Sequence, residues 1–271
     1  MPASWAIYKI RFIENDGGPA TVLMSFRDPF PCRAVVDVTG PDTVVPETQQ
    51  ANSLDVLTVP EPDNPGLIDG LVRWVNHSLS ECAPAALTTK LHGVSLVWRP
   101  GRAAIQTAPD RMEAILAAVV EFSFYESQLR ELERETADSW SQLELDSRLT
   151  CDIGNKDLKH ARAIEQRVRQ ALLRRARLER LAPHLRRPTT FLASLASQLG
   201  ERLREKLRTE DRIETLERQC DVFERIYDMT SQRLSETRIA AKANALEWAI
   251  IILLASETLL LLIEVLWTVD V

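Results

Sequence analysis

The sequence predicts an α+β protein: a small N-terminal α+β head, a long antiparallel helical hairpin or coiled coil, and a C-terminal membrane helix. Three observations predict this order. Short β-like runs separated by proline and glycine come first, long helical periodicity with few breakers follows, and the chain ends in an apolar segment. The expected domains are a head over 1–108, a helical segment with a basic helix over 109–188, a coiled-coil helix over 189–246 and a transmembrane helix over 247–269.

The head contains runs of β-branched and aromatic residues that are typical of strands. Arg99-Pro100-Gly101-Arg102 has the composition of a hairpin tip, and Gly17-Gly18 supplies another turn. Apolar residues at 67, 71, 75 and 79 have helical spacing, so we expect one helix to cross the sheet. The expected strands are 5–13, 21–26, 34–38, 54–59 and 94–98, with a further run, AAIQT, after the hairpin tip.

Three long helices are expected after the head. Pro109-Asp110 is a typical helix start, and no further Pro or Gly occurs before Gly154. A second helix over about 156–182 should end at Pro183, and a third should run unbroken from about 190 to 268. The third helix carries an imperfect heptad seam, which the second helix would cover on one side as an antiparallel hairpin and a second copy on the other. This seam consists of Leu216, Cys220, Phe223, Tyr227, Thr230, Leu234, Thr237 and Ala241.

The C-terminal segment is long enough to cross a bilayer. The 22 residues from Trp248 to Val269 contain no Lys, Arg, Pro or Gly, and as a helix they reach about 33 Å, against a hydrocarbon core of about 30 Å. Their acidic residues, Glu257 and Glu264, are seven apart and share one helical face, which favours contact with protein over contact with lipid. Trp248 and Trp267 fit interfacial anchors. In the alternative interpretation the helix stays out of lipid and both glutamates form the wet edge of a coiled coil.

The flanking charges predict the orientation of this helix. Arg233, Arg238 and Lys242 precede the apolar span and Asp270 follows it, so the bulk of the chain is expected in the cytoplasm. The N-terminus lacks the apolar core of a secretory signal. The four cysteines are scattered without metal-ligand spacing, as in a protein of a reducing compartment.

A basic segment over 156–187 is a candidate anion-binding surface. Its Lys and Arg residues number eleven and its acidic residues three, which leaves a surplus of eight positive charges. The candidate contacts to RNA or anionic lipid are Arg167, Arg174, Arg175 and Arg177. Pairing with the acidic residues of 201–224 in the hairpin partner explains most of the same charge, and this alternative stays open.

The sequence contains no pattern typical of an enzyme. The four histidines are isolated, and no nucleophile elbow, phosphate-binding loop or dinucleotide-binding glycine pattern occurs. We therefore expect a non-enzymatic protein without catalytic residues, metal site, cofactor or small-molecule substrate.

Three stretches resemble one known family. They are FSFYESQLRELE (122–133), the helix over 203–229, and LSETRIAAKANALEWAIIILLASETLL (234–260), in which Leu246-Glu247-Trp248 is followed by an apolar run and Glu257. Together they resemble the required-for-meiotic-nuclear-division family, over about residues 94–266. The family's aromatic-Gly strand end appears here as Val97-Trp98-Arg99-Pro100-Gly101. The resemblance implies a membrane-associated, self-assembling scaffold, and mitochondrial members are linked to organellar translation at the inner membrane.

These observations predict a membrane-anchored homo-oligomeric scaffold that holds a cytoplasmic partner, translation machinery or RNA, near the membrane. Glu247, Trp248, Glu257, Glu264 and Trp267 are the expected anchor and oligomer contacts. The alternative is a soluble coiled-coil regulatory or RNA-binding protein whose apolar tail forms an oligomerisation core.

Overall fold

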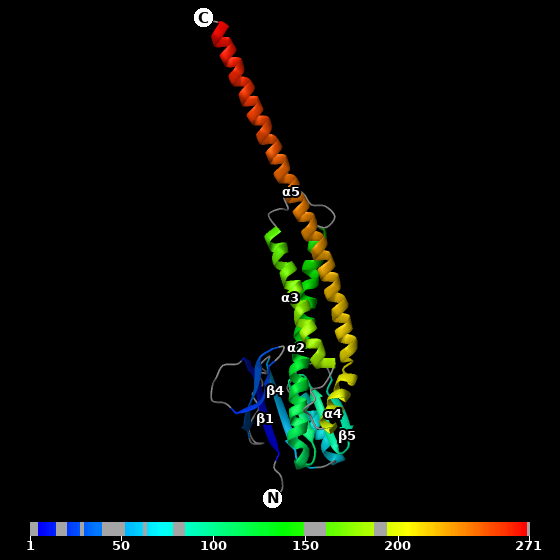
Figure 1. The fold of residues 1–271 in the computed structure, drawn as a ribbon. Helices are drawn as coiled ribbons and strands as arrows, with labels where there is room; N and C mark the ends of the chain where they lie inside the picture. Colours follow the sequence, from blue (N-terminus) through cyan, green and yellow to red (C-terminus); the bar gives the residue numbers. More distant parts are fainter. Residues whose placement is uncertain are drawn as a thin grey trace. The chain divides into compact units, whose positions relative to one another are not determined.

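The structure is a computed structural model that describes residues 5–14, 21–27, 30–39, 52–61, 64–77, 85–148, 161–186 and 194–269. It divides into two compact units. Unit 1 comprises Met1–Glu135 and Arg175–Arg218, and unit 2 comprises Thr136–Arg174 and Gln219–Val271. The chain is a mixed α+β protein with a seven-stranded sheet in its N-terminal part and a long apolar helix at its C-terminal end, as expected (Figure 1).

The sheet of unit 1 has the strand order β2-β3-β1-β4-β7-β6-β5. Neighbouring strands are antiparallel except for β4 and β7, which run parallel. Every expected strand is present, and β5 is an additional strand that the sequence patterns did not predict. The strands are β1 (Ala6–Glu14), β2 (Val22–Phe26), β3 (Cys32–Thr39), β4 (Ser53–Val59), β5 (Leu87–Leu91), β6 (Val94–Arg99) and β7 (Arg102–Gln106).

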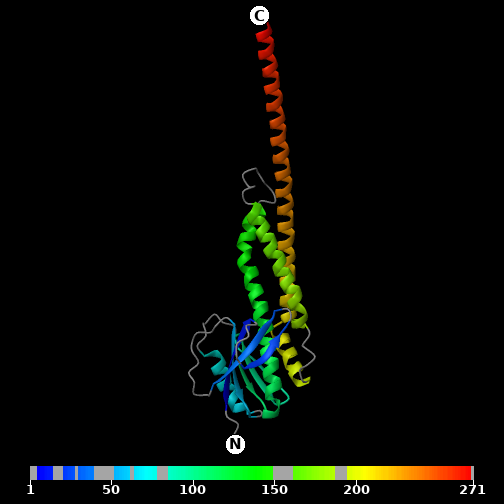
Figure 2. The ribbon, with the colours of Figure 1, turned by 60° about the vertical axis from the view of Figure 1, so that its left-hand side comes forward.

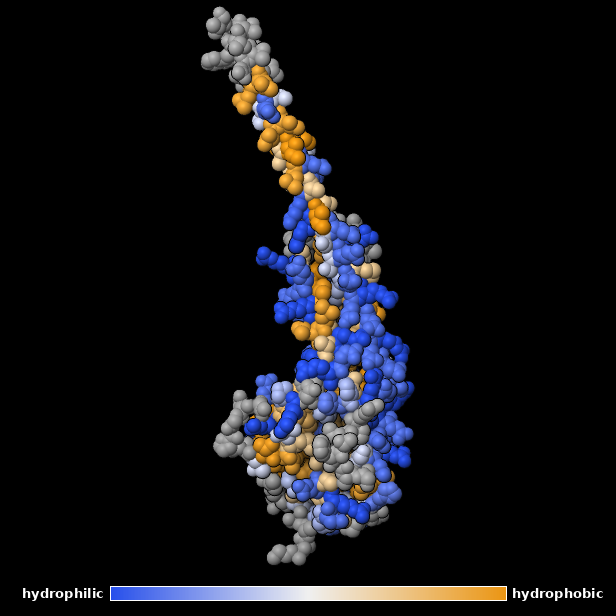
Figure 3. Space-filling view, viewed as in Figure 1, coloured by the Kyte–Doolittle hydropathy of each residue, from blue (hydrophilic) through white to orange (hydrophobic). Residues whose placement is uncertain are grey.

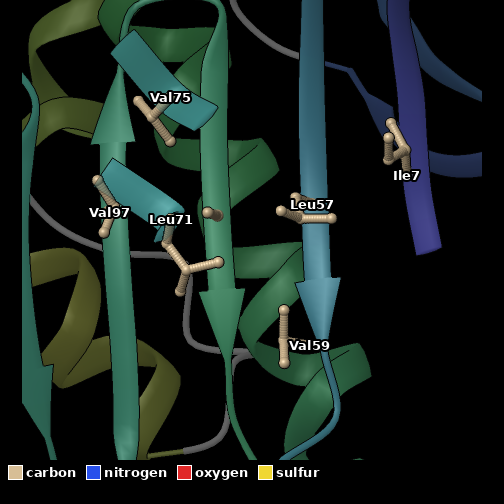
Figure 4. Close-up of a cluster of buried hydrophobic side chains, with 7 residues drawn as sticks. Ile7, Leu57, Val59, Leu71, Val75 and Val97 are labelled. Carbon is tan, nitrogen blue, oxygen red and sulfur yellow. The ribbon is translucent and has the colours of Figure 1, made fainter. Parts of the chain in front are cut away.

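One face of the sheet is covered by the short 3-10 helix η1 (Pro65–Leu67) and by α1 (Ile68–Asn76). Leu71 and Val75 of α1 are buried against apolar side chains of four strands (Figure 4). The helix predicted from the spacing at 67, 71 and 75 is therefore confirmed, whereas Leu79 lies outside the described residues. The strand residues of this core are Ile7, Leu57, Val59, Val97 and Ala104.

The opposite face packs against the first half of α2 (Pro109–Ser147). The Trp98 indole Nε1 donates a 2.9 Å hydrogen bond to Ser123 Oγ of α2, and the Trp98 ring meets Phe122 edge-on at 5.2 Å. Phe26 of β2 stacks on Phe124 of the same helix at 4.1 Å. In Figure 4 this side of the sheet is the far side, behind the strands. The helical start predicted at Pro109 is confirmed.

Two tight turns join the last three strands. His92 and Gly93 both have positive φ angles, 45° and 81°, between the antiparallel strands β5 and β6. Two consecutive positive φ angles match the right-handed twist of a hairpin, and glycine adopts them at no steric cost. Gly101 has φ 80° after Pro100, the pattern of a type II turn, so the predicted hairpin tip is confirmed. The expected turn at Gly17-Gly18 lies outside the described residues.

Three further helices complete the chain: α3 (Ala161–Arg186), α4 (Ser194–Lys206) and α5 (Thr209–Val269). The expectation that Pro183 ends α3 is wrong, because the helix continues through it to Arg186. Pro183 lacks only the hydrogen bond to the carbonyl of exposed Glu179, while its neighbours Leu181, Ala182 and Leu185 are buried and keep the turn helical.

The expectation of one unbroken helix from about 190 to 268 is also wrong. Arg208 has a positive φ of 51° and separates α4 from α5. The backbone N–H groups of Leu207 and Arg208 bond to the carbonyls of Leu203 and Glu205, which closes α4 before α5 begins. Neither glycine nor proline marks this break.

Unit 2 contains parts of α2, α3 and α5, which pass side by side in Figures 1 and 2. One cluster joins Leu143, Ala171, Phe223 and Tyr227, and a second joins Ala161, Ile164 and Leu234. The predicted seam residues of α5 from Leu216 to Leu234 are buried, and Thr237 and Ala241 are half-buried. The seam side chains within unit 2 are therefore covered by helices of the same chain.

Candidate membrane anchor and basic helix

Between Leu246 and Leu261, no other described residue covers α5. Its large apolar side chains between Leu246 and Leu261 are 53–66% exposed, on every side of the helix. Figure 3 shows this stretch as nearly continuous hydrophobic surface. Within the described residues it belongs to the one helix that is long and apolar enough to cross a membrane, and its most apolar window has no buried residue. In water such a surface is unfavourable, because each fully exposed Leu or Ile forgoes about 1.5–3 kcal/mol of burial.

The polar side chains inside this stretch differ in how they are satisfied. Ser256 Oγ donates to the carbonyl of Leu253 at 2.7 Å, and Thr258 Oγ1 donates to that of Ala255 at 2.9 Å. These hydroxyls therefore need no outside partner. Glu257 is exposed, and no hydrogen bond or ion pair joins it to another residue in the described part of the chain.

The other predicted anchor residues lie on the same helix. Glu247 and Trp248 are exposed, at the beginning of the apolar stretch. Glu264 and Trp267 belong to α5, but their side chains lie outside the described ones. The structure thus places all five residues on one continuous helix and leaves their roles as predictions.

Cationic side chains precede the apolar stretch, as the sequence showed. Arg233 lies 3.6 Å from Glu236, and Arg238 lies 3.8 Å from Glu165 of α3. Both pairs are solvent-exposed, so each contributes less than about 1 kcal/mol. These guanidinium groups remain largely hydrated, which suits a position beside lipid headgroups.

In unit 2 the candidate arginines of α3 bind residues of α2. Arg167 Nη1 donates to Asp146 Oδ2 at 2.6 Å, and the Asp146 carboxylate, 5% exposed, also accepts a 3.3 Å hydrogen bond from the Tyr227 hydroxyl. Arg174 donates to Ser139 Oγ at 2.6 Å and lies 4.9 Å from the Phe223 ring. Burial raises the pKa of Tyr227 to about 12, and the neighbouring Asp146 carboxylate adds to the shift.

In unit 1 the remaining candidates are also engaged. Arg177 Nη1 donates to both carboxylate oxygens of Glu135 on α2, each at 3.0 Å. Arg175 Nε donates to Glu179 on its own helix at 2.8 Å, and its Nη1 reaches the Glu217 carbonyl at 3.5 Å. Much of the basic charge is therefore matched inside the chain. Most partners of these four arginines lie on α2, whereas Arg186 of the same helix pairs with Glu210 and Glu217 of the expected segment 201–224.

Two arginines of α3 differ from these four. Arg162 and Arg169 are exposed, and neither forms an ion pair within the described ranges. The sequence does not show which arginines of α3 are paired and which are not, because this depends on which face of the helix meets α2. They are the side chains of α3 that an external anion would meet first.

A partly buried ion-pair network in unit 1 was not predicted. The Arg212 guanidinium binds both oxygens of Glu133, each at 2.8 Å, and both oxygens of Glu126, at 2.8 and 3.1 Å. Arg130 Nε donates to the same Glu126 carboxylate at 2.6 Å. Burial alone would lower the pKa of Arg212, but the hydrogen bonds that its guanidinium donates to Glu133 and Glu126, with the negative charges of both, outweigh burial and raise that pKa. The network fixes the start of α5 to α2.

A cavity of about 390 Å³ in unit 1 lies beside this network. Trp98, Ser123, Glu126 and Arg130 are among its lining residues. Glu126 is held by two guanidinium groups and the Ser123 hydroxyl donates to the Val119 carbonyl, so neither is poised as a base or nucleophile. The described residues contain no cluster of three or more His, Cys, Asp or Glu side chains suited to a metal ion.

No protein-family model matches this chain, and no curated protein matches it either. The resemblance of the C-terminal half to the required-for-meiotic-nuclear-division family therefore stays a prediction.

Proposed function

We propose that this protein is a non-enzymatic, membrane-anchored scaffold that self-associates and positions a cytoplasmic partner, translation machinery or RNA, at the membrane. One observation carries the proposal: the apolar side chains between Leu246 and Leu261 are exposed all around α5. A helix that is apolar on all sides is buried either in a large protein core or in lipid. The described chain supplies no such core, so lipid is the environment that removes this surface from water.

The flanking charges support the orientation in this proposal. Arg233, Arg238 and Lys242 lie on α5 before the apolar stretch, and cations of this kind are retained on the cytoplasmic side. Unit 1 and the part of unit 2 that precedes the apolar stretch would then face the cytoplasm. Joined copies would raise the effective concentration of a bound partner without requiring new contacts.

The helical hairpin and coiled coil are part of the same proposal. Ile164 packs in one cluster with Leu234, and Ala171 packs in another with Phe223. These pairs support α3 folded back along α5, since the residue number rises along one helix as it falls along the other. Because its own helices cover the seam of α5 in unit 2, a second copy would meet the chain through the terminal helix.

The test is fractionation of cells that express the full chain or a chain lacking 246–271. The proposal expects carbonate-resistant pelleting of the full chain and its loss on deletion. A full chain that stays in the soluble fraction as a defined oligomer would reject the anchor and favour the soluble coiled-coil alternative. Affinity purification from solubilised membranes, with the deleted chain as control, would identify the partner.

RNA as the bound partner has its own test. Arg162→Glu and Arg169→Glu reverse exposed charges on α3 without breaking an ion pair between described residues. If RNA binds this helix, its retention should fall steeply between 50 and 200 mM salt, and each reversal should lower it further. Arg218→Glu, on the exposed face of α5, is the matched control. RNA retention that changes neither with salt nor in the α3 variants would exclude RNA binding at this helix.

A further inference from the structure

Glu257 lies in a heptad pattern on the exposed helix. Ile250, Leu253, Glu257 and Leu260 are separated by steps of three, four and three, so they share one face of α5. The three apolar members are 59–66% exposed. The face is thus a heptad seam with one polar side chain in it, separate from the seam that unit 2 covers.

Among the polar side chains at this depth of the helix, one has no hydrogen-bond partner. Ser256 and Thr258 bond to carbonyls of their own helix. Glu257 has no partner in the part of the chain that the structure describes. A carboxyl group in hydrocarbon without a hydrogen-bond partner is strongly unfavourable, so the membrane-embedded form of this helix requires an outside group at the depth of Glu257.

Resting on the proposed membrane anchor, we infer that a second copy of this chain, packed parallel and in register, supplies that group through its own Glu257. Every copy inserts in the same direction, so two adjacent copies place their Glu257 side chains at the same depth. Two carboxyl groups that share protons both donate and accept hydrogen bonds, which makes the pair self-complementary. The sequence after Lys242 contains no basic residue, so a second copy offers a carboxyl group and not a counter-ion.

The apolar members of the face support the same geometry. A single polar residue in an apolar heptad seam specifies register and orientation, because any shift would bury it against apolar side chains. Ile250 and Leu253 on one side and Leu260 on the other would pack against the same residues of the second copy. The contact is isologous, as in a two-fold symmetric pair.

The first experiment measures association of the full chain in detergent micelles by sedimentation equilibrium. Glu257→Leu should weaken association about tenfold, because it removes the shared hydrogen bonds. Glu257→Gln should retain most of it, since an amide also donates and accepts. Glu236→Gln, an exposed residue before the apolar stretch, is the control and should match the unmodified chain. Equal association of the Glu257→Leu chain would overturn the inference.

The second experiment tests the face in vesicles. Oxidation should cross-link Ile250→Cys between copies much faster than Ile252→Cys, which lies about 200° around the helix. The unmodified chain, with its four native cysteines, sets the background. Equal rates for the two variants would contradict the face. A carbonate-resistant chain that is monomeric overturns this inference and the proposed self-association but leaves the anchor, whereas release by carbonate overturns the proposed anchor as well.

Discussion

An arginine at the middle of the terminal helix should largely abolish its insertion. Leu259 is exposed and two residues from Glu257, so an arginine there projects from another face and forms no i,i+4 pair with that carboxylate. The thirteen strongly apolar residues between 250 and 269 contribute about −0.5 kcal/mol each, Glu257 costs about 3 kcal/mol, and Glu264 costs about 1 nearer the edge. The balance is about −2.5 kcal/mol, equivalent to roughly 98% inserted.

Leu259→Arg removes one apolar contribution and adds about 3 kcal/mol, which moves the balance to about +1 kcal/mol and the inserted fraction to about 15%. The assay is translation in the presence of membrane vesicles followed by carbonate extraction. Ile239→Arg is the matched control, because this residue is 66% exposed and precedes the expected span. If the Leu259→Arg chain resists carbonate as fully as the unmodified chain, the reasoning that places this helix in hydrocarbon is refuted.

Three further predictions concern the folded units. Arg212→Met should lower the free energy of unfolding by about 3 kcal/mol in urea titrations, because the buried Glu126 carboxylate, 1% exposed, then keeps only Arg130 as a partner. Arg218→Met breaks a surface ion pair and should lower the free energy of unfolding by less than about 0.5 kcal/mol. The pKa of Tyr227 rises from 10 in the unfolded chain to about 12, so its neutral hydroxyl stabilises the fold below pH 10 and this contribution is lost as pH rises through 12. The stability advantage over Tyr227→Phe should shrink across that window, and a constant advantage would contradict the assignment. Gly93→Ala should destabilise the fold by about 1 kcal/mol, because alanine is strained at a φ of 81°. Gly70→Ala lies in α1, where an added Cβ meets open space, and should stabilise the fold by about 0.5–1 kcal/mol. Thermal melts that reverse the two signs would contradict these backbone assignments.

The sequence located elements whose patterns result from burial. Runs such as LDVLTV became β4, whose last four residues are all buried, and the heptad of α5 became a buried seam. Strand β5, LTTKL, was missed because it lies at the edge of the sheet and only Thr89 of its residues is fully buried. Apolar and polar residues therefore do not alternate clearly along this strand. A lysine of α4 satisfies one backbone group of this edge strand, since Lys206 Nζ donates a hydrogen bond to the Thr88 carbonyl.

Helix boundaries set by tertiary packing could not be predicted. Arg208 takes a positive φ without any glycine, and Pro183 stays helical because buried neighbours hold it. The charge pattern of α3 predicted pairing with 201–224, which Arg186 forms with Glu210 and Glu217. It did not predict the ion pairs of α3 with α2. Sequence spacing gives the face of one helix, whereas the identity of the facing helix depends on how three helices assemble.

The three long helices have a consequence for how this protein can be dissected. Because α2, α3 and α5 each contribute residues to both units, the polypeptide passes from one unit to the other three times, at positions 135/136, 174/175 and 218/219. A fragment that stops after Glu135 would lack the segment 175–218 that completes unit 1. Cleavage at any crossing interrupts a continuous helix. Loss of structure in one unit should therefore spread to the other, so that heat or denaturant melts the pair in a single step.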